Sequence, residues 1–457
     1  MFVLSRALYA WAGVRFNDWP LGVYWQYLDP FLLKRKLGES LLYLHGQPPL
    51  FNLYLGAALA TGREKAVFVA TFLLCGLATY AGAFLLMRRL GVGAPLAFLL
   101  ATWLATAPTF VAYENWLFYS LPVAALLVLA ALALERAARR GRTRDGLLFL
   151  GILAVVCGTR SLYHLAYLLA AVALLALAWR DARRALVAAA LPVVLVAGLY
   201  AKNAVLFGHF AASTWTGMSL AHLTTDGLSA AELRGLVEAG TLSPASLVPA
   251  FSRPMLYRRT YFDPPPATRV RALYWEEKTT GGPNFNHAAY ARISADLLRD
   301  ALWVIRHHPR LYLASVAEGW RIYFRSAADL RFLGAENVEA LRPASDFYDV
   351  VFFGRVSGPE SDPRVPARYW GLILGLPFVF GLGVAAAFGR GPGRGLDRTQ
   401  RLLAGFLCFN IAYVAVVGNL LELGENNRFR FETDPLSVCL LGLALQSAFE
   451  RVRRLRA

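Results

Sequence analysis

LFYSLPVAALLVLAALAL, residues 117–134, is an apolar stretch of 18 residues that contains no charged side chain. A basic segment, ERAARRGRTR at residues 135–144, follows it directly. An α-helix of 18 residues rises about 27 Å, which is close to the hydrocarbon thickness of a bilayer, about 30 Å. The stretch therefore predicts a transmembrane helix that ends in a strongly cationic loop.

The composition extends this prediction to the whole chain. Of its 457 residues, 57% are hydrophobic and only 17% are charged, whereas a soluble domain carries about 25% charged residues. This composition excludes a disordered chain, a disulfide scaffold and an ordinary cytosolic enzyme. A net charge of +17 is also found in nucleic-acid-binding proteins. Here, however, the arginines are concentrated in short loops between apolar runs, where they set membrane orientation, so we expect no nucleic acid partner.

Apolar runs recur along the chain and predict an all-α, polytopic membrane protein with about ten transmembrane helices. The first predicted span is short and contains Arg6 and Arg15. The ten predicted spans are residues 1–16, 67–87, 93–112, 117–134, 146–159, 162–179, 185–205, 366–388, 402–420 and 435–449.

Arginine clusters predict the orientation of these spans. One cluster follows the second span, three others separate the fourth span from the fifth, the sixth from the seventh and the eighth from the ninth, and the last closes the chain. All five lie on one side of the membrane if the N-terminus is cytoplasmic, which is the orientation that the positive-inside rule selects. We interpret the chain as a multi-pass protein of the bacterial inner membrane, with both termini in the cytoplasm and the active site on the periplasmic face.

The spans divide the chain into three parts. These are an N-terminal membrane module at residues 1–205 with its first outer loop at 17–66, a periplasmic region at 206–365, and C-terminal transmembrane helices at 366–457. Two more apolar stretches, residues 51–61 and 311–324, would each invert every later arginine cluster if counted as a span. We therefore predict that both are interfacial helices on the outer face. Segments such as AYARISADLLRDALWVIRHHP, residues 289–309, predict amphipathic helices in a small periplasmic cap.

The ionisable side chains show where chemistry could occur. Carboxylates are nearly absent from the spans and collect just outside them on the predicted outer face: Asp18, Asp29, Glu114, Glu422, Glu425, Glu432 and Asp434. Cations accompany them at the same level: Arg160, Lys202, Arg428 and Arg430. A transporter tends to place ionisable groups within its spans, whereas this arrangement suits a lipid-borne anion that reacts with a polar molecule. A lipid or polysaccharide transporter or flippase is the alternative interpretation.

Short motifs in this set resemble a known family. They are an acidic residue after the first span, the turn HGQPPL at residues 45–50, Glu114 in the second outer turn, Arg160 after the fifth span, and ENNRFRFETDPL at residues 425–436. In order and sidedness they resemble the integral-membrane glycosyltransferases of the GT-C class that use polyprenyl-phosphate sugars. This class includes the protein O-mannosyltransferases and the lipid A aminoarabinose transferases.

The resemblance implies roles for individual residues. The acid of the first outer loop is the expected catalytic base. Its position after the span favours Asp18, while its helix-like setting and its spacing to the proline pair favour Asp29, which we place first. Glu114 is expected to orient substrate hydroxyls. The expected substrate-binding residues are His45, Gln47, Tyr113, Asn115, Arg160, Glu425, Arg428 and Arg430.

The implied reaction is a single displacement with inversion at the anomeric carbon. A polyprenyl-phosphate sugar is the expected donor, and a glycan, a lipid or a protein is the expected acceptor. We predict metal-independent transfer, because no acidic pair or histidine cluster marks a metal site. We also expect the side chains of Asp18, Asp29, Glu114 and Arg160 to converge in one pocket at the outer membrane boundary.

Overall fold

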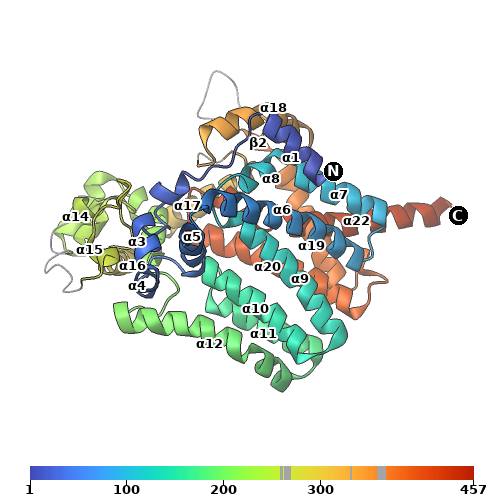
Figure 1. Cartoon of the computed structure of the whole chain (residues 1–457), viewed down its shortest axis with the longest axis horizontal. Coiled ribbons are helices and arrows are strands. Elements are labelled where there is room, and N and C mark those ends of the chain that lie inside the picture. The colour runs from blue at the N-terminus through green and yellow to red at the C-terminus, as the bar shows by residue number, and fades with distance from the viewer. Residues whose placement is uncertain (258–260, 262–268, 330–331, 358–366, 457) are drawn as a thin grey trace.

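The chain folds into a helical bundle with a helical cap at one end (Figure 1). The computed structural model describes residues 1–257, 261, 269–329, 332–357 and 367–456. Helices account for 73% of the structure and strands for 2%, so the predicted all-helical character is confirmed. The two short strands, β1 (Arg355–Val356) and β2 (Arg368–Tyr369), pair antiparallel.

Five of the described helices are long and apolar enough to cross a membrane. They are α6 (Glu64–Arg89), α9 (Ser120–Arg140), α12 (Ala182–Phe207), α19 (Trp370–Ala387) and α20 (Arg398–Leu421). A sixth candidate is the pair α7 (Ala94–Thr106) and α8 (Pro108–Glu114), which is bent by 59°. The bend has a local cause, since a proline disfavours helical backbone in the preceding residue and Ala107 is extended there.

The predicted count of ten spans is therefore not confirmed. Helix α1 (Phe2–Trp11) has 10 residues and rises about 15 Å, half of the hydrocarbon thickness. Helices α10 (Thr143–Thr159) and α11 (Leu165–Trp179) have 17 and 15 residues. Helix α22 (Asp434–Arg456) has 23 residues, but its C-terminal turns are charged. Apolar composition alone did not show where each helix begins and ends.

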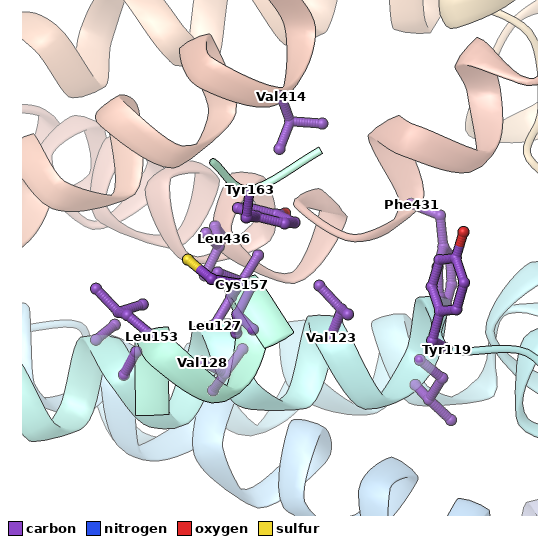
Figure 2. Packing of buried hydrophobic residues seen from close by; sticks show 14 of the residues in the cluster. Tyr119, Val123, Leu127, Val128, Leu153, Cys157, Tyr163, Val414, Phe431 and Leu436 are labelled. Carbon is purple, nitrogen blue, oxygen red and sulfur yellow. The ribbon is translucent and has the colours of Figure 1, made fainter. Parts of the chain in front are cut away.

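Helix α9, which contains most of the stretch at residues 117–134, lies in the middle of the bundle and packs against α6, α10 and α20. Side chains from α9, α10, α20 and α22 meet in one buried cluster (Figure 2), which includes Val128, Leu153, Cys157, Val414 and Leu436. Segments that are far apart in the sequence thus share a single core.

The arginine-rich loops meet at one end of the bundle. Arg139 lies 3.2 Å from the carboxylate of Asp397, and Arg398 donates to the carbonyl of Leu177 at 2.8 Å. Gln400 donates to the carbonyl of Arg89 at 3.0 Å. Four of the five predicted arginine clusters therefore belong to loops or helix ends that touch one another.

The cap lies at the opposite end from these loops (Figure 1). Its helices are α13 (Thr216–Leu223), α14 (Ala230–Glu238), α15 (Arg271–Tyr274), α16 (Ala289–His307) and α17 (Pro309–Tyr323). Helix α18 (Ala335–Val351) lies apart from them and packs against α8 (Figure 1). The first outer loop adds α2 (Pro20–Val23), α3 (Pro30–Arg35), α4 (Leu37–Leu42) and α5 (Leu50–Ala60). The helices expected at residues 51–61, 289–309 and 311–324 are thus present as α5, α16 and α17. The predicted boundary between residues 365 and 366 lies outside the described residues.

Candidate functional site

A cavity of about 570 Å³ lies where the bundle meets the cap. Its walls come from the end of α10, the start of α11, the end of α20, helix α13 and helix α21 (Asn426–Phe431), together with Trp25, Gln26 and Gln47 of the first outer loop. One part of the wall is apolar and includes Leu162, Leu169 and Phe210, of which Leu169 and Phe210 are exposed on the protein surface. The other part collects charged side chains.

Arg160 contributes one of two buried guanidinium groups to the charged part. Helix α10 ends directly before it, and its extended backbone turns the chain toward α11. Its side chain forms an ion pair with the fully buried carboxylate of Glu432, which also accepts a hydrogen bond from the Tyr163 hydroxyl at 3.1 Å. A buried ion pair is held in place because removal of either partner leaves an uncompensated charge.

Arg428, on α21, contributes the second guanidinium and is only 3% exposed. Its Nε donates to Oε2 of Glu425 at 2.9 Å. Its Nη1 is buried and has no hydrogen-bond partner among the described residues. A buried donor without a partner costs about 1–3 kcal/mol, more when the group is charged. The unmet N–H therefore indicates a place for an anion.

The two guanidinium groups share their aromatic neighbours. Arg160 and Arg428 lie 4.4 and 5.0 Å from the ring centre of Phe429, and 5.7 and 5.8 Å from that of Tyr119. Cations over aromatic faces are stabilised by the ring quadrupole. The same rings thus hold two positive charges close together beside the cavity.

Glu422 and His222 form a second polar group in the wall. Glu422 directly follows α20, and Gly424, with a φ of +118°, lets the chain turn back so that both Glu422 and Glu425 face the cavity. Burial, reinforced by the charge of Glu425, raises the pKa of Glu422 to about 7. His222 Nδ1 lies 2.9 Å from the carboxylate of Asp226. Burial alone would lower the pKa of His222, but Asp226 and Glu422 outweigh it and raise that pKa.

Asp29 does not line this cavity. It is the N-cap of α3, where Oδ1 accepts from the backbone N–H of Phe31 at 2.7 Å. The other carboxylate oxygen accepts from the backbone N–H of Thr279, whose hydroxyl donates to Oδ1 at 3.0 Å. The carboxylate of Asp29 thus fixes a helix end to the cap.

Glu114 and Asp18 also lie outside the cavity. Glu114 forms a bidentate ion pair with Arg6, whose Nε and Nη2 donate to the two carboxylate oxygens at 2.7 and 2.8 Å. Gly76 of α6 leaves the space for this carboxylate, since a Cβ there would lie 1.8 Å from Glu114 Oε2. Asp18 is half-buried, and its backbone carbonyl accepts from Leu21 at the start of α2. The expectation that three carboxylates converge with Arg160 in one pocket is therefore wrong, because only Arg160 lines it.

The predicted binding residues divide into two groups. Gln47, Arg160, Glu425 and Arg428 line the cavity, and Gln47 accepts a hydrogen bond from the Ser161 hydroxyl at 3.2 Å. The other four, His45, Tyr113, Asn115 and Arg430, do not line it.

Each residue of the second group has a packing role. His45 is fully buried between Thr214 and Asn286, at 2.7 and 3.0 Å, and burial lowers its pKa to about 3. Tyr113 stacks on Phe431, with ring centres 3.8 Å apart. The carbonyl of Asn115 accepts from the N–H of Asn17, and Arg430 Nη1 donates to the carbonyl of Tyr323 at 2.6 Å.

Sequence reasoning missed the roles of His222, Trp25 and Gln26 in the cavity wall, and it gave Glu422 no role beyond its place on the outer face. The signal for Glu422 was its position directly after a span and three residues before Glu425. Trp25 and Gln26 belong to the segment YWQYLDP, residues 24–30, in which only Asp29 was selected. Within the described part of the chain, no group of three or more His, Cys, Asp or Glu side chains could hold a metal ion.

Comparison with known proteins adds no assignment to this geometry. No family model, no curated protein and no solved structure matches the chain.

Proposed function

We propose that the protein is a membrane glycosyltransferase that moves a sugar from a polyprenyl-phosphate carrier to an acceptor on the outer face of the membrane. The observation that carries this proposal is the composition of the cavity wall, with two buried arginines in one part and exposed apolar side chains in another. A lipid phosphate needs both environments, because its head is an anion and its tail is a hydrocarbon. The order of motifs that resembles the GT-C class supports the same function.

The donor's phosphate would lie against Arg160 and Arg428. The unpartnered Nη1 of Arg428 supplies a charge-assisted donor, and such bonds are about twice as strong as neutral ones. The prenyl chain would leave past Leu169 and Phe210, which are exposed at the apolar part of the wall. The two fixed cations would also stabilise the negative charge that develops on the leaving phosphate.

Glu422 is the proposed general base in place of Asp29 or Asp18. It is a carboxylate that lines the cavity, and its pKa of about 7 matches the range in which a base works best at neutral pH. Glu422 would take the proton from an acceptor hydroxyl as that oxygen forms a bond to the anomeric carbon. The bond between this carbon and the phosphate oxygen would break with its electron pair on the phosphate, so the configuration inverts.

The test measures release of sugar from the carrier. The purified protein in lipid nanodiscs is mixed with polyprenyl-phosphate mannose, glucose or arabinose, each labelled in the sugar, and with a bacterial envelope extract as acceptor. We expect label to leave the polyprenyl-phosphate donor, separated from the products by chromatography, with at least one donor. Arg428→Gln should weaken the donor's apparent affinity about tenfold, which corresponds to loss of one charge-assisted bond.

Arg253→Gln, which changes an exposed arginine of the cap that pairs with Glu277, is the matched control and should behave like the wild type. Binding of the donors without release of sugar would contradict a transferase and favour the lipid transporter. Absence of both binding and release would contradict the proposal as a whole.

A further inference from the structure

A second, smaller hollow of about 150 Å³ adjoins the main cavity. Six aromatic side chains line it: Trp19, Tyr24, Trp25, Trp116, Phe118 and Phe332. Two polar side chains, Gln26 and Glu425, complete the wall together with Val23. Its volume is below the range of about 300–1,000 Å³ that whole ligand sites occupy. The hollow is therefore the size of a subsite and not of an independent site.

The aromatic wall is held rigidly. Trp116 Nε1 donates to the Tyr24 hydroxyl at 2.9 Å, and this hydroxyl donates to the carbonyl of Phe332 at 2.9 Å. Trp116 and Phe118 stack with ring centres 4.5 Å apart. Trp19, at the mouth of the hollow, is 61% exposed and packs edge-on against Tyr24 at 5.9 Å. The rings thus form a preformed surface with one exposed indole.

The polar side chains of the hollow have unused hydrogen-bond acceptors. Gln26 is only 8% exposed, yet its Oε1 has no hydrogen-bond partner in the described part of the chain. Glu425 uses Oε2 for Arg428, and among the described residues no hydrogen bond reaches its Oε1. The Oε1 atoms of Gln26 and Glu425 can each accept a hydrogen bond from a donor inside the hollow, such as a hydroxyl group.

The hollow and the main cavity are neighbours with shared walls. Trp25, Gln26 and Glu425 line both of them. A molecule bound in the hollow would therefore present its inner edge to the cavity, where the donor sugar and Glu422 are proposed to lie.

We propose that the acceptor is a carbohydrate and that this aromatic hollow binds its sugar ring. The proposal rests on the proposed glycosyltransferase function and names its acceptor class. A pyranose ring has C–H faces that pack on aromatic rings and hydroxyl groups that donate to Gln26 and Glu425. A lipid tail would offer no donor to the Oε1 atoms of Gln26 and Glu425, which is costly. An extended peptide could reach the hollow only with single side chains.

The experiment identifies the atom that receives the label. After the transfer reaction with the envelope extract, linkage analysis of the labelled products locates the new bond. We expect it on a hydroxyl of another sugar. A new bond to a protein side chain, or to a lipid that contains no sugar, overturns the inference while leaving the transferase function intact. Failure to release sugar from any donor contradicts the transferase function itself.

A pair of variants tests the hollow directly. Trp19→Ala removes an exposed side chain of the hollow and should raise the KM for the sugar acceptor at least fivefold. Trp11→Ala removes another exposed tryptophan that lines neither cavity and should leave this KM and the slow hydrolysis of donor by water unchanged. Gln26→Leu should also raise the KM for the sugar acceptor. An unchanged KM in both Trp19→Ala and Gln26→Leu overturns the inference.

Discussion

At the scale of single residues, the carboxylates of this protein differ in role because their surroundings differ, and not because of their residue type. Asp29 accepts hydrogen bonds on both oxygens from a helix N-terminus and from Thr279. Glu422 instead sits in the cavity wall beside His222 of α13, Ser219 of the same helix and Glu425 of its own loop. Burial then favours its neutral form, and the neighbouring Glu425 adds repulsion.

Substitution of Glu422 tests its role as base. Glu422→Gln should lower the transfer rate by about 10²–10⁴-fold, the contribution of general base catalysis. In the wild type the rate should rise as the pH increases through about 7, because only the ionised carboxylate accepts a proton. Rates from pH 5.5 to 8.5 check both statements. Glu238→Gln, on the exposed face of α14, is the control, and full activity of Glu422→Gln would exclude this residue as the base.

Although Glu422→Gln should lower the transfer rate, it should raise the stability of the folded protein at alkaline pH. The pKa of Glu422 is higher in the folded protein than its ordinary value of 4.5. The folded state therefore binds more protons between about pH 4.5 and 7, and stability falls as the pH rises through this window. Glu422→Gln removes this loss, so at pH 8 its unfolding temperature should exceed that of the wild type. A lower unfolding temperature would show that the side chain is needed for packing.

At the scale of elements, helix ends decide what each side chain can do. Asp29 caps α3, and Arg160 emerges where α10 stops. The amphipathic pattern of α16 and the apolar run of α5 were visible in the sequence, because a helical period is a local property. The break at Ala107 could have been foreseen from Pro108. The end of α1 was marked by Gly13, whose φ is +102°. The late start of α11 could not be foreseen, because Leu162 and Tyr163 precede this helix and continue its apolar run.

The capping role of Asp29 predicts a mild phenotype for a neutral replacement. Asparagine caps helices as well as aspartate, so Asp29→Asn should keep α3 and lower the transfer rate by less than about tenfold. Asp29→Ala should cost about 0.5–2 kcal/mol of stability from the lost cap. Activity assays and thermal unfolding of both variants check this. A loss of 10²-fold or more in a well-folded Asp29→Asn protein would restore Asp29 as the candidate base.

Close approach of α13 and α16 positions His222. Gly217 of α13 lies so near α16 that a Cβ would be 1.8 Å from the Ser294 carbonyl oxygen. Gly217→Ala should therefore destabilise the cap by about 1–3 kcal/mol, the usual cost of overpacking. Gly235→Ala on α14, where a Cβ meets no atom within 4 Å, should instead stabilise the protein by about 0.5–1 kcal/mol. Thermal unfolding of the pair checks the contrast, and equal unfolding temperatures would contradict it.

At the scale of the whole molecule, the site depends on contacts that no local pattern encodes. Thr279 meets Asp29, and Thr214 meets His45, across 250 and 169 residues of chain. Sequence patterns placed Arg160, Gln47, Glu425 and Arg428 on the side of the spans opposite the arginine-rich loops, and the cavity lies where the bundle meets the cap on that side. They could not show that the cap holds Asp29 away from the cavity and brings His222 into it.

The common end of the arginine-rich loops predicts how the protein lies in the membrane. The cysteine of an Arg142→Cys variant, in the loop between α9 and α10, should be protected from an impermeant maleimide in intact cells and labelled only after lysis. The cysteine of a Thr241→Cys variant, in the exposed part of the cap after α14, should be labelled in intact cells. The native cysteines are buried or half-buried and serve as the background. The reverse pattern would invert the proposed orientation.

The pairing of Arg160 and Arg428 above the same two rings has a thermodynamic consequence. Burial and the charge of Arg428 lower the pKa of Arg160, so the two guanidinium groups repel each other although Glu432 and Glu425 pair with them. A multivalent anion that binds beside them would weaken this repulsion, and mass action would then raise the melting point with the logarithm of anion concentration. Pyrophosphate should protect the fold against heat more than chloride at equal ionic strength, and neutral lipids should leave it unprotected.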